Sequence, residues 1–163
     1  MNITIDIILP PIIVAMLTGM ILTTSSMIID STVENRLTYE LQNFANTSLE
    51  IIAYEVRGSQ EVLNADGPDL HFIRFNQDTV HMYKSGRNLL VATDFAGTSV
   101  NDTTSYPAKF GDLVFDLDPA GIMLTVSVTT ESRAEQEVGN NAERFKGFAV
   151  KDIYLRNLHL SNP

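Results

Sequence analysis

Residues 7–29, IILPPIIVAMLTGMILTTSSMII, form an uncharged and largely apolar run that lies between Asp6 and Asp30. An α-helix rises about 1.5 Å per residue, so this run would reach roughly 34 Å, enough to cross the hydrocarbon core of a bilayer, which is about 30 Å thick. The run therefore predicts a transmembrane helix. The side chains expected to contact the membrane interior are Ile7, Ile8, Ile12, Ile13, Val14, Leu17, Ile21, Leu22, Ile28 and Ile29.

Two other interpretations of this apolar run remain open. A cleaved signal peptide would have a basic segment before the run and small residues at a cleavage site. The first basic residue of the chain is Arg36, which disfavours a signal peptide. A buried core helix is the other alternative, although such helices are usually shorter than this run.

Pro10 and Pro11 lie near the start of the run. Proline lacks a backbone N–H and clashes with the preceding turn when it stands inside a helix. The sequence therefore predicts either that the helix begins at these prolines or that it is kinked there. A helix that begins at Pro10 still has about 20 residues, which suffices for a membrane span.

The composition limits what the rest of the chain can be. The 163 residues include 11 Lys plus Arg and 20 Asp plus Glu, which gives a net charge of −9. Such a chain lacks the basic surface that binds nucleic acid, so nucleic acid is not an expected partner. The sequence has no cysteine, which excludes disulfides and cysteine-ligated zinc within it. Beyond the first 30 residues, about 130 remain, enough for one domain with an ordinary core.

Helical periodicity continues after Asp30, but on one face only. Apolar residues recur at steps of three or four, while charged residues largely fall elsewhere. No proline or glycine interrupts residues 31–57, and Gly58 follows, so we expect one continuous helix of about 45 to 50 residues that ends there. Because a one-sided apolar stripe has to be covered, it should pack on a sheet. The stripe consists of Val33, Leu37, Leu41, Ala45, Leu49, Ile52 and Val56, and Phe44 and Ile51 widen it. The residues expected to pack on the sheet are Val33, Leu37, Leu41, Phe44, Leu49, Ile52 and Val56.

Short strand-like segments after the helix predict an antiparallel sheet. They lie between turn signals such as residues 64–68 and 118–121. Residues 93–112 are rich in Gly, Ser, Thr, Asn and Asp, and we expect a long surface loop there. Residues 131–146 should form an extended hairpin tip. The predicted strands cover residues 70–75, 80–84, 89–92, 113–117, 122–129 and 147–157.

These elements predict an α+β fold, in which a long N-terminal helix packs on a C-terminal antiparallel sheet. Residues 1–30 would form a membrane-spanning assembly helix, and residues 31–163 a head domain. Within the head, the amphipathic helix would cover residues 31–57 and the sheet residues 69–157.

This layout resembles that of the type IV pilins, in particular the minor pilins and pseudopilins of type IV pili and type II secretion. Residues 40–57, ELQNFANTSLEIIAYEVR, are similar to a helix segment of the J-type pseudopilin and its pilus counterpart, where an apolar stripe ends in an acidic-apolar-Arg step. Residues 147–157, which close in Leu155-Arg156-Asn157, are similar to the terminal strand of those proteins.

The resemblance implies a structural, non-enzymatic subunit of a pilus-like or secretion pseudopilus filament. Its partners would be copies of itself or other pilin-like subunits, contacted through the N-terminal helix, and membrane lipid before assembly. The protein would be a single-pass protein of the cytoplasmic (inner) membrane with an extracytoplasmic head, or part of an extracellular filament. An apolar helix that leaves the bilayer has to bury its surface elsewhere, and side-by-side packing of such helices does this.

Asp6 is the expected assembly residue. It would occupy the fifth position of a mature chain that began at Asn2, a position where the family carries Glu. An isolated carboxylate in an apolar filament core is unfavourable, and the N-terminal amine of a neighbouring subunit would offset its charge. The alternative is that Asp6 only marks the boundary between membrane and water.

No catalytic motif or phosphate-binding loop is present, so no catalytic residue, cofactor or metal site is expected. His71 and His81 could face each other across a hairpin, but two histidines without a nearby carboxylate pair are weak evidence for a metal. Two groups of polar residues offer the oxygen ligands that calcium prefers, but their spacing fits no ordered calcium loop. They are Asp94, Asn101 and Asp102, and Asp112, Asp116 and Asp118.

Two other functional classes remain open. In one, the chain is a monomeric, membrane-anchored binding module whose sheet domain captures a ligand. In the other, it is a membrane-tethered enzyme, for which the sequence offers no recognisable nucleophile or acid–base pair.

Overall fold

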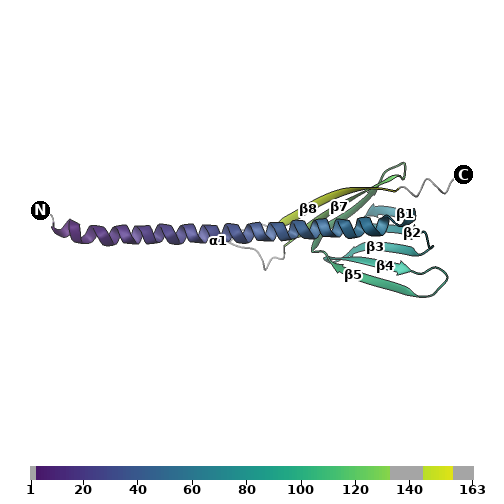
Figure 1. Cartoon of the computed structure of the whole chain (residues 1–163), viewed down its shortest axis with the longest axis horizontal. Coiled ribbons are helices and arrows are strands. Elements are labelled where there is room, and N and C mark those ends of the chain that lie inside the picture. Colours follow the sequence, from purple (N-terminus) through teal and green to yellow (C-terminus); the bar gives the residue numbers. More distant parts are fainter. Residues whose placement is uncertain (1–2, 133–144, 156–163) are drawn as a thin grey trace. The chain divides into compact units, whose positions relative to one another are not determined.

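The computed structural model describes residues 3–132 and 145–155, with side chains from residue 9 onward (Figure 1). The chain divides into two compact units, Met1–Leu37 and Thr38–Pro163. The first unit is helical throughout its described part, and the second contains the rest of the helix and a sheet. An α+β layout with a long apolar N-terminal helix and an antiparallel sheet is thus confirmed.

Helix α1 covers Ile3–Val56, 54 residues, and ends where Gly58 predicted a stop. Pro10 and Pro11 lie inside it, so the alternative in which the helix begins at these prolines is wrong. The carbonyls four residues before them, those of Asp6 and Ile7, cannot receive the usual helical hydrogen bond, because proline has no N–H.

Among the described residues the sheet has eight strands, where the sequence predicted six. The two additional strands are β1 and β5. The strands are β1 Ser59–Gly67, β2 Asp69–Arg74, β3 Thr79–Ser85, β4 Asn88–Asp94, β5 Asn101–Pro107, β6 Phe110–Leu117, β7 Met123–Glu131 and β8 Lys146–Tyr154.

The expectation of a long loop over residues 93–112 is wrong, because β5 and the start of β6 lie within it. Residues 102–106 read DTTSY, and threonine and tyrosine favour extended structure even though the segment contains no aliphatic side chain. Strand β1 was missed for a related reason: its second half contains Asn64, Asp66 and Gly67, which are turn formers. Residues 133–144, most of the predicted hairpin tip, and residues 156–157 of the predicted last strand lie outside the described part.

All neighbouring strands are antiparallel, in the order β5-β4-β3-β2-β1-β6-β7-β8. Strands β1 and β6 pair over only two positions. Asp66 lies opposite Asp116, and Gly67 lies opposite Phe115. The predicted hairpin at residues 118–121 is confirmed, since the Gly121 amide donates to the Asp118 carbonyl at 2.7 Å.

The core of the second unit forms between the helix and one face of the sheet. Buried residues alternate along β7 and along the first part of β2 and β3, as Leu70 and Phe72 illustrate with no exposed surface. On the helix, the buried residues recur at steps of three or four and belong to the same apolar cluster as the strand residues. They are Ala45, Leu49, Ile52, Ala53 and Val56.

The buried side of the helix begins later than the sequence indicated. Val33 is 37% exposed and Leu37 is half-buried, whereas Leu41 is only 2% exposed. Val33 and Leu37 belong to the first unit, whereas the sheet belongs to the second, which begins at Thr38. The expected packing of Val33 on the sheet stays a prediction. Phe44 is half-buried, at the rim of the buried stripe.

Gly147, at the start of β8, allows the helix backbone to approach the sheet closely. A Cβ atom at this position would lie 2.6 Å from the carbonyl carbon of Leu41 and 2.7 Å from the amide nitrogen of Gln42. Next to it, the Thr130 hydroxyl donates to the Leu41 carbonyl at 2.9 Å. Glycine at 147 therefore sets the spacing between helix and sheet.

We expect Gly147→Ala to lower the free energy of unfolding of the head by about 1 to 3 kcal/mol, because the added methyl group meets backbone atoms that cannot move aside independently. Gly58→Ala is the matched control, since its Cβ would lie 3.8 Å from the nearest atom outside its chain neighbours, the Glu55 carbonyl oxygen. Denaturant unfolding of both variants measures the difference. Equal stabilities of the two variants would show that the close approach has no energetic role.

Candidate functional site

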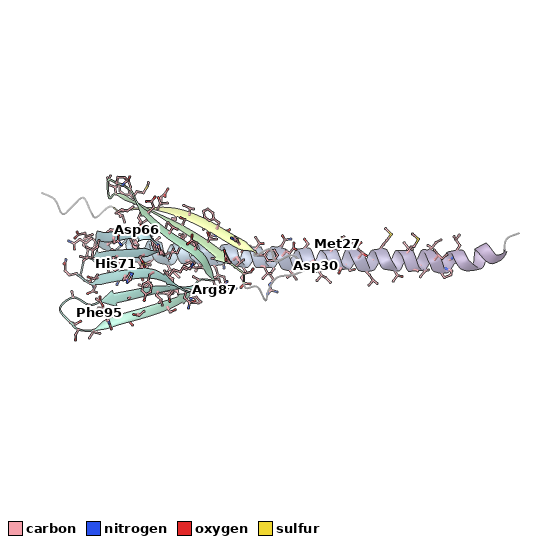
Figure 2. The ribbon with its side chains drawn as sticks, turned by 180° about the vertical axis from the view of Figure 1, so that it is seen from behind. Met27, Asp30, Asp66, His71, Arg87 and Phe95 are labelled. Carbon is pink, nitrogen blue, oxygen red and sulfur yellow. The ribbon has the colours of Figure 1, made fainter. Side chains whose placement is uncertain are left out.

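The most unusual surface of the chain is the apolar helical segment of residues 9–29. Every one of these side chains is exposed. The most apolar window of the helix has a mean hydropathy of 2.1 and none of it is buried among the described residues. One helix is thus long and apolar enough to cross a membrane. Figure 2 labels Met27 and Asp30, which lie at the end of this segment.

Most of the side chains predicted to contact the membrane interior belong to the part of the helix whose side chains the structure describes. Those that are described are between 47% and 66% exposed and have no cover from the described part of the chain. They are Ile12, Ile13, Val14, Leu17, Ile21, Leu22, Ile28 and Ile29. Asp6, Ile7 and Ile8 lie in the helix, but their side chains are outside the described part.

Threonine hydroxyls within the apolar segment are bonded to the helix itself. Thr18, Thr23 and Thr24 each donate to the carbonyl four residues earlier, at 2.8, 2.9 and 2.8 Å. A hydroxyl that is satisfied within its own helix needs no water, so these residues do not prevent the helix from entering an apolar environment. The segment therefore presents an apolar surface along its whole described length.

Three ion pairs fix the second half of the helix to different parts of the sheet. They join the helix to β2, to the β5–β6 connection and to β8. The pairs are Glu55 with Arg74, Glu40 with Lys109, and Glu50 with Lys151. The hydrogen bond and charge of Lys151 lower the pKa of Glu50. Because each pair is partly exposed, its contribution is small, and its main effect is on how the helix is aligned.

The edge of β8 is partly closed by a helix side chain. The Gln42 amide donates to the Phe148 carbonyl at 2.8 Å and accepts from the Phe148 amide at 3.3 Å. These two bonds occupy the backbone groups that another strand would use at this point. Gln42 therefore protects the first half of the β8 edge.

A pocket of about 400 Å³ lies between the end of the helix and the second half of β8. Ala53, Val56, Arg57 and Ser59 line one side, and residues 151–155 line the other. Apolar side chains such as Val56 and Ile153 line it together with the charged side chains of Arg57, Lys151 and Asp152. Sequence reasoning missed this pocket, because its two sides come from segments that are far apart in the chain.

His71 and His81 face each other directly on β2 and β3, on the side of the sheet opposite the helix. Their ring centroids are 3.7 Å apart, and His81 also stacks on Tyr83 at 4.4 Å. His81 Nε2 lies 3.5 Å from Asp69 Oδ1 without forming a hydrogen bond to any described residue. Burial lowers the pKa of His71, and the nearby His81 lowers it further, while Asp69 opposes the shift.

Within residues 3–132 and 145–155, no three His, Asp or Glu side chains are grouped so that they could hold a metal ion. Asp94 and Asn101 face each other at the start of the β4–β5 hairpin, whereas Asp112 and Asp116 lie along β6. All four are exposed, and they are spread over β4, β5 and β6.

Comparison with known proteins does not identify this chain. No protein-family description, no curated protein and no solved structure matches it.

We expect the head to lose stability as the pH falls below about 6.5, because the folded state holds the pKa of His71 below its unfolded value and so binds fewer protons than the unfolded state. His71→Gln removes this titration and should flatten the dependence of unfolding free energy on pH between roughly pH 7 and 5. Denaturant unfolding at several pH values measures it. An unchanged pH slope in the variant would contradict the assignment to His71.

Proposed function

We propose that this chain is a structural, non-enzymatic subunit that assembles through its N-terminal helix into a filament of the type IV pilus or secretion pseudopilus kind. Before assembly the helix spans the cytoplasmic membrane once, with the head on the extracytoplasmic side. Its partners are other copies of the chain or other pilin-like subunits.

The exposed apolar surface of residues 9–29 carries this proposal. An apolar helix of this length is stable either in lipid or against similar helices, and a filament core provides the second environment when the subunit leaves the first. The compact head, whose core needs no residue of this segment, supports an arrangement in which the segment remains available for other contacts.

A second candidate is a monomeric, membrane-anchored binding module, and the pocket next to Arg57 and Lys151 favours it. In that case the helix serves only as an anchor, and the head alone binds the ligand. The two candidates predict different effects of removing the helix on assembly and on ligand binding. Electron microscopy of the native material tests directly for a helical array.

Deletion of residues 1–29 should give a soluble monomer that no longer assembles, because the fragment keeps the core of the head and loses the apolar segment. Light scattering and electron microscopy of the fragment and the full chain measure this. An anchored binding module predicts instead that the fragment keeps its full activity. Assembly of the fragment at the level of the full chain would refute a role of the helix in assembly.

Asp6→Ala should reduce filament yield more than membrane insertion, because the carboxylate is proposed to pair with the N-terminal amine of a neighbouring subunit in an apolar core. Asp30→Ala is the matched control, since it removes the same charge at the other end of the apolar run. Membrane fractionation measures insertion, and electron microscopy measures filaments. Normal filament yield from the Asp6 variant would remove this role.

A further inference from the structure

The two edges of the sheet are β5 and β8. The sheet has eight strands and each is antiparallel to its neighbour, so β5 and β8 run in opposite directions. A second copy in the same orientation would therefore present its β5 antiparallel to β8 of the first. Such a contact would continue the sheet from one copy to the next.

Among the described residues, the open part of the β8 edge is its second half. Phe148 directs its backbone groups away from β7, toward Gln42. In an antiparallel strand every second residue does the same, so Val150, Asp152 and Tyr154 also point outward. No described residue bonds to their outward backbone groups, and the pocket of about 400 Å³ lies beside them.

Strand β5 offers a matching edge. Its residues are exposed except for Tyr106, which is half-buried. The Phe95 amide donates to the Val100 carbonyl at 3.3 Å, which closes the β4–β5 hairpin. The Val100 carbonyl thus points toward the β4 side, and in an antiparallel strand the direction of the backbone groups alternates from one residue to the next. The residues that direct their backbone groups away from β4 are therefore Asn101, Thr103 and Ser105.

On the helix side of the sheet, the charges of the two edges are complementary. Residues 88–107 contain two acidic residues, Asp94 and Asp102, and no basic residue. Asp102 lies opposite the buried Thr93 and so lies on the helix side of the sheet. Lys151 lies on the same side, where it pairs with Glu50 of the helix, and Arg57 lines the pocket beside it.

We propose that β5 of one copy pairs with the open half of β8 of the next copy. This contact rests on the proposed filament function, in which all subunits share one orientation. Thr103 lies opposite Asp152, Asn101 opposite Tyr154, and Ser105 opposite Val150. Asp102 is then within reach of the Lys151 side chain on the neighbouring copy.

Cysteine cross-linking tests the contact, and the chain contains no cysteine that would interfere. Full-length chains with Thr103→Cys and with Asp152→Cys are prepared separately, mixed, assembled and oxidised. Directly opposite residues in an antiparallel ladder have Cα atoms about 5.5 Å apart, which a disulfide can bridge. We expect disulfide-linked dimers in the mixture and in neither variant alone, and a ladder of larger products from the double variant.

Charge variants give a matched control on the same hairpin. In the Thr103→Cys chain, Asp102→Lys should lower the cross-linked fraction several-fold, because it places a positive charge toward Lys151. Asp94→Lys makes the same change on the opposite face of the sheet and should leave the fraction unchanged. A second control uses Asp116→Cys in place of Asp152→Cys. Asp116 is exposed but lies on an inner strand of the sheet, so this variant should not cross-link to Thr103→Cys.

Electron microscopy of each sample separates the two proposals. Filaments without mixed cross-links would overturn the edge contact and leave the filament function intact. Dimers from Thr103→Cys alone would also overturn it, since they would show a symmetric β5–β5 contact. Chains that remain single in the membrane and form no filaments would overturn both proposals.

Discussion

The apolar surface of residues 9–29 is the constraint on which the rest of the molecule depends. Nothing in the described part of the chain covers it, and water is an unfavourable environment for it. The uncharged run ends at Asp6 and Asp30, so no charge interrupts the surface that lipid or other helices would contact. Because these residues contribute nothing to the core of the head, the head has to be complete without them, and its apolar cluster is built from residues 45–155 alone.

The head in turn depends on the second half of the same helix. Leu49, Ile52 and Val56 fill the face of the sheet that would otherwise be exposed, and each such buried side chain contributes about 2 kcal/mol. Gly147 lets the backbones approach, and three partly exposed ion pairs align the helix along the sheet. One continuous helix thus has two kinds of surface. Its N-terminal part carries apolar side chains on all sides, and its C-terminal part carries them only on the side that faces the sheet.

Sequence reasoning predicted the elements that have a strong periodic signal and missed those that depend on distant parts of the chain. The helix up to Val56 and the β6–β7 hairpin follow from apolar periodicity and turn residues. Strand β5 is extended because it pairs with β4, and its polar sequence alone is typical of a loop. The pocket and the Gln42–Phe148 bonds join segments about a hundred residues apart, and no local pattern indicates them.

The two sheet edges differ in a way that bears on assembly. At β8 the helix already occupies the edge at Phe148 through Gln42, so a partner strand has only the second half available and its register is restricted. At β5 no described strand other than β4 pairs with the edge, and the exposed strand is polar, which favours contact with water while its outer backbone groups stay available. Two different edges on one chain favour contact between β5 and β8 over contact of an edge with itself. A contact between unlike surfaces does not close after two copies, so it extends along an assembly in which all copies share one orientation.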